Sequence, residues 1–518
     1  MTQFPVNIAS DKNEFNANLW AKTNRSNGID NAVPASGLPA RHPSTGIPVL
    51  IIGAGIGGLM TTSECWRKGH DVVVILERSQ GPIYSGDIIV IQTSAVSTIR
   101  HWPDMLRDME RGQVHATVSF KTHDGRHIYG PTVPSFNDPE HLATRKVPYV
   151  APAQVRHKFH SMLLRQVKRC GIRIEYREMV TSYFEFERAG KGGMIIEASG
   201  NDEEIRVADI VVAADGLKSA AEILIAGQHN PTKPSGLSIY RAAFDKDLAM
   251  QDELVRKRWG NGPPVWEYWL GPGMYLGVFI GNDIVSYGFT PRDNVVEGTA
   301  TESWEPDTDS ETVTRTMLSG ASNWDPAVMA LVRTAPRGSI VHWPLLWRNL
   351  RREWTFPAGR IVQIGDSAHS FIPTSGNGAS QALEDAITLA TCLQLAGNPG
   401  RGGLGSKIYN LLRYERVSCA QKMSFVNSQL KTDTDWDAVW RDPAMVRTRF
   451  PAWVFKHDPE AYAYEKFGET SAHLVTGSEF VDTNYPPGHA FRAWTLDEVW
   501  RDIESGKRVE DLLDGNWS

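Results

Sequence analysis

Residues 49–58 read VLIIGAGIGG and decide the fold of this chain. The apolar run Val49–Ile52 is typical of a buried strand, and the glycines that follow open a helical segment that ends near residue 69. A second apolar run, residues 72–76, leads directly to Glu77. A strand, a glycine-rich turn, a helix and a second strand in this order predict a βαβ unit of the Rossmann type.

The conspicuous residues of this unit each have a physical role. Gly53 permits the tight turn, Gly55 lets a pyrophosphate approach the backbone, and Gly58 lets the helix pack closely on the strand. Glu77 follows about twenty residues later, where a carboxylate accepts hydrogen bonds from an adenine nucleotide's ribose and disfavours a 2′-phosphate. A chance glycine-rich loop is the alternative, but the complete strand–helix–strand context favours a dinucleotide site.

A second signature lies far downstream, after the apolar run at residues 360–364. Asp366 follows that run, where its carboxylate can accept a hydrogen bond from a sugar-like hydroxyl; considered alone, it would be interpreted as a turn or helix cap. Pro373, Gly376 and Gly378 then precede a helix with an apolar face that begins near Ala379. The amino-terminal amides of such a helix stabilise negative charge on a reduced flavin. Together the two signatures predict FAD.

Composition narrows the class of protein. A length of 518 residues fits two or three domains, and a net charge of -6 without a basic stripe does not favour a nucleic-acid partner. The four cysteines are scattered, without the spacing of a zinc site or redox dithiol, so no metal is expected. No window reaches the roughly 18 apolar residues of a membrane span. The amino terminus lacks a secretory or transit pattern, so a soluble, cytoplasmic protein is expected.

Because both signatures would touch one ligand, the chain between them must leave the nucleotide-binding domain and return to it. We expect a discontinuous FAD-binding domain at residues 47–230 and 335–430, with a substrate domain inserted at residues 231–334. Residues 1–46 are expected to form a flexible extension, and residues 431–518 a C-terminal region.

The expected fold class is α/β: a Rossmann-type FAD-binding domain, an inserted, mainly antiparallel β-sheet substrate domain and a helical C-terminal region. Residues 236–290 alternate aromatic and β-branched runs with Gly-Pro turns, as antiparallel strands do. Residues 118–129 have the form of a β-hairpin, and an apolar strand at residues 210–214 runs into Asp215. Beyond about residue 414 the patterns weaken.

Three ordered motifs resemble those of single-component FAD-dependent aromatic hydroxylases of the salicylate or p-hydroxybenzoate hydroxylase type, and especially their fungal secondary-metabolism branch. The motifs are residues 53–58 with Glu77, residues 214–219 (ADGLKS), and Gly365-Asp366 with His369, Pro373, Gly376, Gly378 and Asp385. The resemblance implies that the motif around Asp215 serves FAD and the nicotinamide donor, that Arg156 reaches the flavin, and that Val90 and Ala379 line the cofactor. The Pro-Asn pair common in the family is missing near Val90.

The resemblance also implies a reaction. NADPH or NADH reduces FAD, the flavin reacts with O₂ to form a C4a-hydroperoxide, and one oxygen atom passes to a phenolic or polyketide-like aromatic molecule by hydroxylation or oxidative dearomatisation. The cofactor carries this chemistry, so the protein is expected to orient the substrate and exclude water. No second dinucleotide fingerprint appears, which is consistent with transient binding of the nicotinamide in the same cleft.

Arg241 and Tyr275 are the candidates for substrate activation. A guanidinium near a phenol favours the phenolate, which raises electron density on the ring. The simpler interpretations are a surface salt bridge for Arg241 and a core position for Tyr275. Trp266, Tyr268 and Trp269 are either pocket aromatics or ordinary core, and His369 either contacts flavin or closes a loop.

Other functions fit the same cofactor. The flavin could serve an epoxidase or a Baeyer–Villiger enzyme acting on a non-aromatic metabolite. A flavin halogenase or a non-catalytic flavin-binding protein is a further alternative, although the Trp-x-Trp-x-Ile-Pro signature of halogenases is not present in the sequence.

Overall fold

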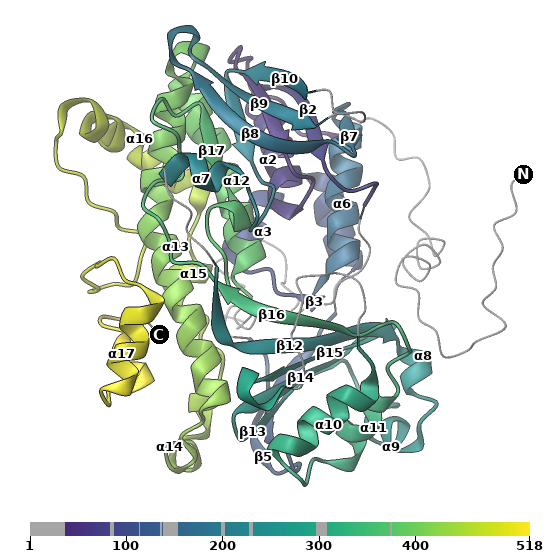
Figure 1. Ribbon diagram of the computed structural model, residues 1–518. Helices are drawn as coiled ribbons and strands as arrows, with labels where there is room; N and C mark the ends of the chain where they lie inside the picture. Colours follow the sequence, from purple (N-terminus) through teal and green to yellow (C-terminus); the bar gives the residue numbers. More distant parts are fainter. Residues whose placement is uncertain are drawn as a thin grey trace, which may run out of the picture.

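The computed structural model describes residues 37–82, 88–112, 114–134, 137, 154–197, 203–226, 232–296, 308–372 and 376–517 (Figure 1). Of the expected extension, residues 1–36 lie outside this range. Residues 37–46 run along the end of helix α2 (Ile56–Arg67). There Arg41 donates hydrogen bonds to the carbonyl groups of Trp66 and His70 at 3.0 and 2.8 Å.

A five-stranded parallel sheet lies at the centre of the nucleotide-binding part. Its strands, in spatial order, are β17 (Ile361–Gln363), β11 (Ile210–Ala213), β1 (Pro48–Ile52), β2 (Asp71–Glu77) and β7 (Ile174–Tyr176). The apolar runs of the sequence form these strands, which confirms the Rossmann-type unit. Because parallel strands end at one edge of a sheet, the loops after β1, β2, β11 and β17 meet there.

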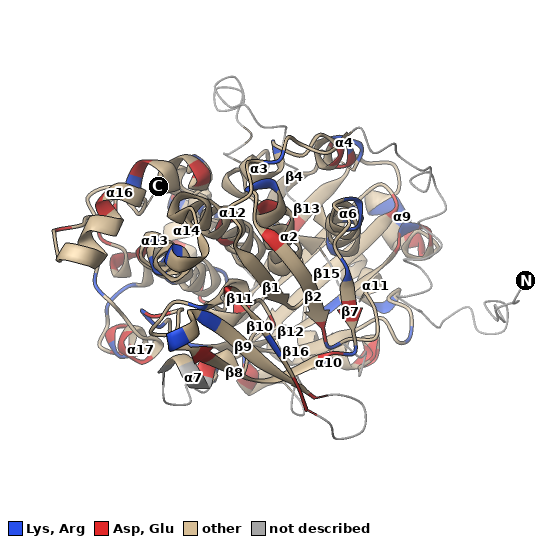
Figure 2. Ribbon diagram, turned by 90° about the horizontal axis from the view of Figure 1, so that it is seen from above, with Lys and Arg blue, Asp and Glu red and all other residues tan. Residues whose placement is uncertain are grey.

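Both faces of this sheet are covered. Val49 and Ile51 pack against a cluster from α2, α6 (Arg156–Arg169) and α12 (Gly378–Ala396), because alternate residues of a strand point to opposite faces. Leu50 and Ile52 pack against a three-stranded antiparallel sheet. The strands of that sheet are β8 (Met179–Phe186), β9 (Lys191–Glu197) and β10 (Glu203–Ala208). Figure 2 shows these layers from above, with acidic and basic residues mingled over the outer elements.

A seven-stranded sheet forms the second part of the molecule. Its strands, in spatial order, are β16 (Val341–Trp347), β12 (Lys233–Asp245), β15 (Ile284–Pro291), β14 (Met274–Ile280), β13 (Val265–Gly271), β4 (Thr117–Thr122) and β5 (His127–Thr132). All neighbours are antiparallel except β13 and β4. The antiparallel sheet and the β4–β5 hairpin were both predicted from the sequence, and both predictions are confirmed. The sheet also takes strands from outside residues 231–334, and the domain limits stay a prediction.

Short helices cover the outer face of this sheet, and Figure 1 shows them on the side away from the parallel sheet. They are α8 (Lys246–Ala249), α9 (Glu253–Trp259), α10 (Ser310–Gly320) and α11 (Pro326–Arg333). Trp269 of β13 and Tyr287 of β15 pack in the core beneath them. The inner face of the sheet is therefore left for the nucleotide-binding part.

The C-terminal region is helical, as expected, and a long helix from the segment before residue 431 leads into it. Helix α13 (Gly402–Thr432) has 31 residues, about 46 Å at 1.5 Å per residue, and reaches from the parallel sheet to β13 and β14. It is buried on nearly every side, so it lacks the polar stripe that reveals a surface helix in a sequence. The helices that follow are α14 (Trp436–Arg441), α15 (Ala452–Phe455), α16 (Pro459–Thr476) and α17 (Leu496–Glu504).

The remaining described elements are short. They are β3 (Ile88–Ile89), β6 (Gln154–Val155), α3 (Thr93–Ile99), α4 (Pro103–Arg111), α7 (Ala221–Ala226) and the 3-10 turns η3 (Glu187–Ala189), η4 (Asp293–Val295), η5 (Gly365–Ser367), η7 (Pro399–Arg401), η8 (Pro443–Val446) and η9 (Val509–Leu512). Within the described part of the chain, none of the helices has the length and apolar character needed to cross a bilayer.

A buried ionic cluster joins α12 to α13. Arg413 Nε lies 2.8 Å from Asp385 Oδ1, and Arg416 Nε lies 2.8 Å from Glu384 Oε2. All four side chains are almost completely buried. Burial opposes ionisation of Asp385, but the charges of His369 and Arg413 outweigh it and lower the pKa of this carboxyl group. The cluster thus persists as charged pairs without access to water.

We expect Arg413→Met to destabilise the protein by about 3–5 kcal/mol, because removing one partner leaves buried charge uncompensated. The measurement is the shift of the thermal unfolding midpoint. Arg508→Met is the matched control, since Arg508 also pairs with an acid, Asp511, but is 74% exposed. Equal unfolding midpoints for the two variants would contradict the structural role of the cluster.

Candidate active site

A cavity of about 600 Å³ lies between the carboxyl edge of the parallel sheet and the inner face of the seven-stranded sheet. Most of the residues predicted for the site line it: Gly53, Gly55, Glu77, Val90, Arg156, Asp215, Arg241, Tyr275, Asp366, Gly376, Gly378 and Ala379. Gly58 lies behind the lining, and Pro373 lies outside the described residues. The two signatures, more than 300 residues apart, therefore face one space.

The glycines of the first motif are required by close backbone contacts. Gly53 has φ +100, and a Cβ atom on it would lie 2.3 Å from the carbonyl oxygen of Ala214. A Cβ atom on Gly58 would lie 2.0 Å from the carbonyl oxygen of Gly53. At Gly55, by contrast, no described heavy atom lies within 4 Å of that position, so the backbone before α2 is open to the cavity. This cradle fits a pyrophosphate at a helix amino terminus.

Glu77 holds this cradle in place from the end of β2. Its Oε2 accepts a hydrogen bond from Ala54 N, and its Oε1 accepts one from Ser79 N, both at 2.8 Å. A carboxylate oxygen has further lone pairs, so these bonds orient Glu77 without exhausting its capacity for ribose hydroxyls. On the other side of the loop, His160 Nε2 lies 2.7 Å from the carbonyl oxygen of Ala54. Burial lowers the pKa of His160 to about 4, so a neutral imidazole supports the turn at neutral pH.

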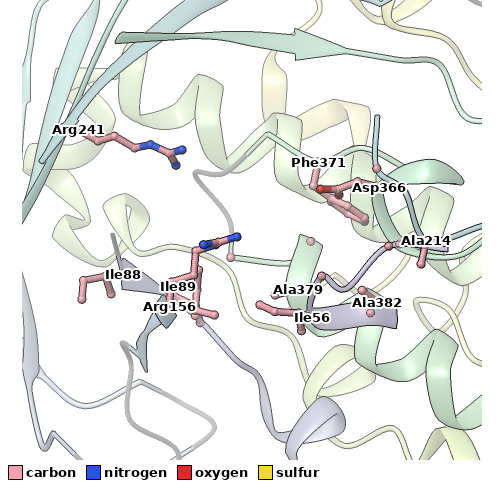
Figure 3. Close-up of a pocket in the computed structure, with 18 of the residues that line it drawn as sticks. Ile56, Ile88, Ile89, Arg156, Ala214, Arg241, Asp366, Phe371, Ala379 and Ala382 are labelled. Carbon is pink, nitrogen blue, oxygen red and sulfur yellow. The ribbon is translucent and has the colours of Figure 1, made fainter. Parts of the chain in front are cut away.

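Asp366 projects into the cavity from η5, directly after β17 (Figure 3). The turn is fixed because Gly365 N donates to Asp385 Oδ2 at 2.9 Å, and His369 Nε2 lies 2.6 Å from the same oxygen. His369 thus closes the loop from behind and does not line the cavity. The Asp366 side chain is exposed to the cavity, yet the surrounding protein raises its pKa by desolvation. A hydroxyl-bearing ligand that fills the cavity would satisfy this carboxyl group.

The start of α12 completes the cofactor side. Gly376 has φ +65, and a Cβ atom on it would lie 2.5 Å from Val90 Cβ, so the two lining segments are in contact. Helix α12 begins at Gly378 without a side-chain cap, and its first turn lines the cavity. Its free amide groups can therefore stabilise negative charge on a ligand.

Asp215 lies at the carboxyl end of β11 and also lines the cavity. Tyr183 Oη donates a hydrogen bond to Asp215 Oδ2 at 2.8 Å. Burial raises the pKa of Asp215, although this hydrogen bond opposes the effect. The middle motif is therefore in contact with the same space as the other two.

The opposite wall comes from the seven-stranded sheet. Arg241 of β12 and Arg156 at the start of α6 point into the same space from opposite sides (Figure 3). Tyr275 of β14 and Tyr268 of β13 line the aromatic end of the cavity, where Tyr268 stacks on Phe120 with ring centroids 5.1 Å apart. This side of the cavity, called the aromatic wall below, therefore presents the guanidinium of Arg241 together with the rings of Tyr268 and Tyr275.

The three neighbouring aromatics of β13 do not share one environment. Trp266 and Tyr268 line the cavity, whereas Trp269 is completely buried on the other face, beneath α8–α11. Of the two interpretations of these aromatics, the core position therefore holds for Trp269, because side chains alternate along a strand. The two-residue period of a strand therefore already places Tyr268 and Trp269 on opposite faces of the sheet.

Three residues that were not predicted from the sequence also line the cavity. Thr448 and Phe450 line the aromatic end of the cavity, and Phe371 lines its cofactor side. These residues belong to no motif and no regular element, so residue type and spacing give no signal for them.

Comparison with known proteins agrees with this geometry. Residues 46–402 match the model of a family described as FAD binding domain. FAD-dependent monooxygenase mdpD of Emericella nidulans is 76% identical over 522 residues, covering 100% of both chains. The crystal structure of CtdE in complex with FAD and a substrate has a TM-score of 0.73 at 26% identity and covers 83% of this chain and 99% of that one.

The resemblance to salicylate hydroxylase is confirmed at the level of the fold. The structure titled salicylate hydroxylase substrate complex has a TM-score of 0.62 at 21% identity and covers 81% of this chain and 98% of that one. The chain therefore belongs to the FAD-binding-domain family and is a FAD-dependent monooxygenase.

Proposed function

We propose that this enzyme uses NADPH or NADH to insert one oxygen atom from O₂ into a phenolic or polyketide-like aromatic metabolite, by hydroxylation or oxidative dearomatisation, in fungal secondary metabolism. One observation carries the proposal: the dinucleotide cradle opens into the same cavity as an aromatic wall that contains a guanidinium. Such a wall suits an electron-rich ring with an acidic hydroxyl group.

The residues of the cofactor side would hold FAD in an extended form. The amides at Gly55 would bind the pyrophosphate, Glu77 the adenosine ribose, and Asp366 a hydroxyl of the ribityl chain. Arg156 and the start of α12 would then lie near the isoalloxazine, where a positive guanidinium and free amides favour negative charge on the reduced ring. FAD, when bound, supplies the activation of O₂ and the transfer of one oxygen atom.

The protein's own residues would orient the substrate and stabilise its negative charge. Arg241 would hold the phenolic oxygen and favour its ionised form, because a nearby cation stabilises the anion. Trp266 and Tyr268 would pack on the ring, and Phe450 would help to exclude water. The nicotinamide donor would use the same cavity, with Lys218 and Arg78 at its lining as partners for its phosphates.

The function is tested by incubating the FAD-loaded enzyme with NADPH, O₂ and a panel of phenols, with the methyl ethers of those phenols as matched controls. We expect phenols to stimulate NADPH oxidation and to yield products that contain one atom of isotopically labelled O₂. Labelled product from a non-aromatic ketone or alkene, but not from the phenols, would instead favour Baeyer–Villiger chemistry or epoxidation. NADPH oxidation without labelled product would contradict the proposal.

Asp366→Ala should weaken FAD binding roughly 10- to 100-fold, since a hydrogen bond to a charged group contributes about 1.5–3 kcal/mol. The dissociation constant is measured by adding FAD to the apoprotein and following protein fluorescence. Asp283→Ala, at a half-exposed carboxylate paired with Lys158, is the control. The role of Asp366 is refuted if both variants bind FAD as the wild type does.

Arg241→Ala should lower the rate of product formation at least tenfold while leaving FAD affinity nearly unchanged, because Arg241 lies on the substrate side of the cavity. Arg241→Lys should keep part of the activity, since it retains the charge but not the planar fork. Arg256→Ala, at an exposed position of α9, serves as the control. Full turnover by Arg241→Ala would mean that another group orients the substrate.

A further inference from the structure

Lys431 carries a buried amine next to the aromatic end of the cavity. It lies in the last turn of α13, where this helix packs on β13 and β14, and it is only 1% exposed. Its Nζ lies 5.1 Å from the ring centroid of Tyr268 and 6.0 Å from that of Tyr275. Both rings line the cavity, so Lys431 stands directly behind the wall that a substrate would touch.

The ammonium group of Lys431 has no hydrogen-bond partner among the described residues. The buried Lys68 and the partly buried Lys121 are compensated: Lys68 Nζ lies 2.6 Å from Glu460 Oε1, and Lys121 pairs with Glu267. Burying an amine without such a partner costs free energy, and burial lowers the pKa of Lys431 to about 7. A side chain this costly to the fold points to a role outside folding.

Among the residues that the structure describes, no acid neutralises Lys431. The neighbouring Asp433 is 76% exposed and faces Arg292, with Oδ2 and Nη2 3.8 Å apart. The titratable groups that face Lys431 from β13 and β14 are Tyr268 and Tyr275, and burial raises the pKa of Tyr268, so that ring stays neutral. When Lys431 is protonated, its charge lies behind two rings that line the cavity and favours an anion on their other side.

We propose that Lys431 is a positioning residue that makes the aromatic end of the cavity select an anionic ring, a phenolate, over a neutral ring of the same shape. The inference rests on the proposed function and specifies its substrate class. Arg241 would act on the phenolate from β12, and Lys431 would act through Tyr268 and Tyr275 from the opposite end of the wall. A bound anion would in turn keep the Lys431 amine charged.

The test compares binding of two probes to the FAD-loaded enzyme: 2,4-dinitrophenol, at a pH below the pKa of Lys431 where this phenol is still ionised, and its neutral methyl ether, 2,4-dinitroanisole. Binding is followed by isothermal calorimetry. We expect the wild type to prefer the phenolate, and Lys431→Met to lose about tenfold of this preference, which is about 1.4 kcal/mol. Methionine is unbranched and apolar and only one atom shorter than lysine, so it removes the amine while it fills most of the same space.

Two further measurements distinguish a role of Lys431 in phenolate selection from a purely structural role. Lys431→Met should raise the thermal unfolding midpoint, because an uncompensated buried amine is replaced by an apolar group. Lys422→Met is the matched control: Lys422 lies on the same helix with its Nζ 6.0 Å from the Trp494 ring, away from the cavity, and should keep the phenolate preference. If Lys431→Met does not fold, Lys431→Gln keeps a polar end without the charge and should show the same loss.

The outcomes are distinct. No phenolate preference in the wild type, or an unchanged preference in Lys431→Met or Lys431→Gln, would overturn the inference. A preference that depends on Lys431 in an enzyme that oxygenates no phenol would support the inference and contradict only the proposed reaction. Oxygenation of phenols without a dependence on Lys431 would leave the proposed function intact and refute the role of Lys431.

Discussion

The parallel ladder of β2, β1, β11 and β17 is the constraint on which the site depends. Hydrogen bonding in register places the carboxyl ends of these strands at one edge, and each strand is followed there by one polar or glycine-rich segment. Gly53, Glu77, Asp215 and Asp366 thereby line one cavity although the sequence separates them widely. No individual side chain brings them together; the backbone pairing does.

Helix α12 connects the carboxyl edge of the parallel sheet to the rest of the molecule. It packs on α2, its start lines the cavity, and its buried acids bind the arginines of α13. Asp385 belongs both to that cluster and to the turn that presents Asp366, since it accepts the hydrogen bond of Gly365. Helix α13 then extends to the seven-stranded sheet, with Lys431 in its last turn. The cofactor side and the aromatic wall are thus connected through one rigid helix pair.

The sequence predicts those parts of the molecule that follow from local rules. Glycines at close backbone contacts, apolar strands and the helix dipole at Gly378 all leave patterns of residue type and spacing, and they identify the cofactor side. The aromatic wall is harder to predict, because tertiary packing alone brings its further residues there: Lys431 lies on a helix that is buried on nearly every side, and Thr448 and Phe450 lie outside any regular element. Trp269 is an exception: strict alternation along β13 places it away from Tyr268, and this could have been deduced from the sequence.

The most direct test of the account is a crystal structure of the enzyme with FAD and a phenolic ligand bound. We expect one FAD molecule with its pyrophosphate at Gly55, its isoalloxazine beside the start of α12, and the phenol between that ring and Arg241. An FAD whose two halves contact only one of the signatures, or a phenol bound outside the shared cavity, would contradict the central claim that both signatures serve one cofactor.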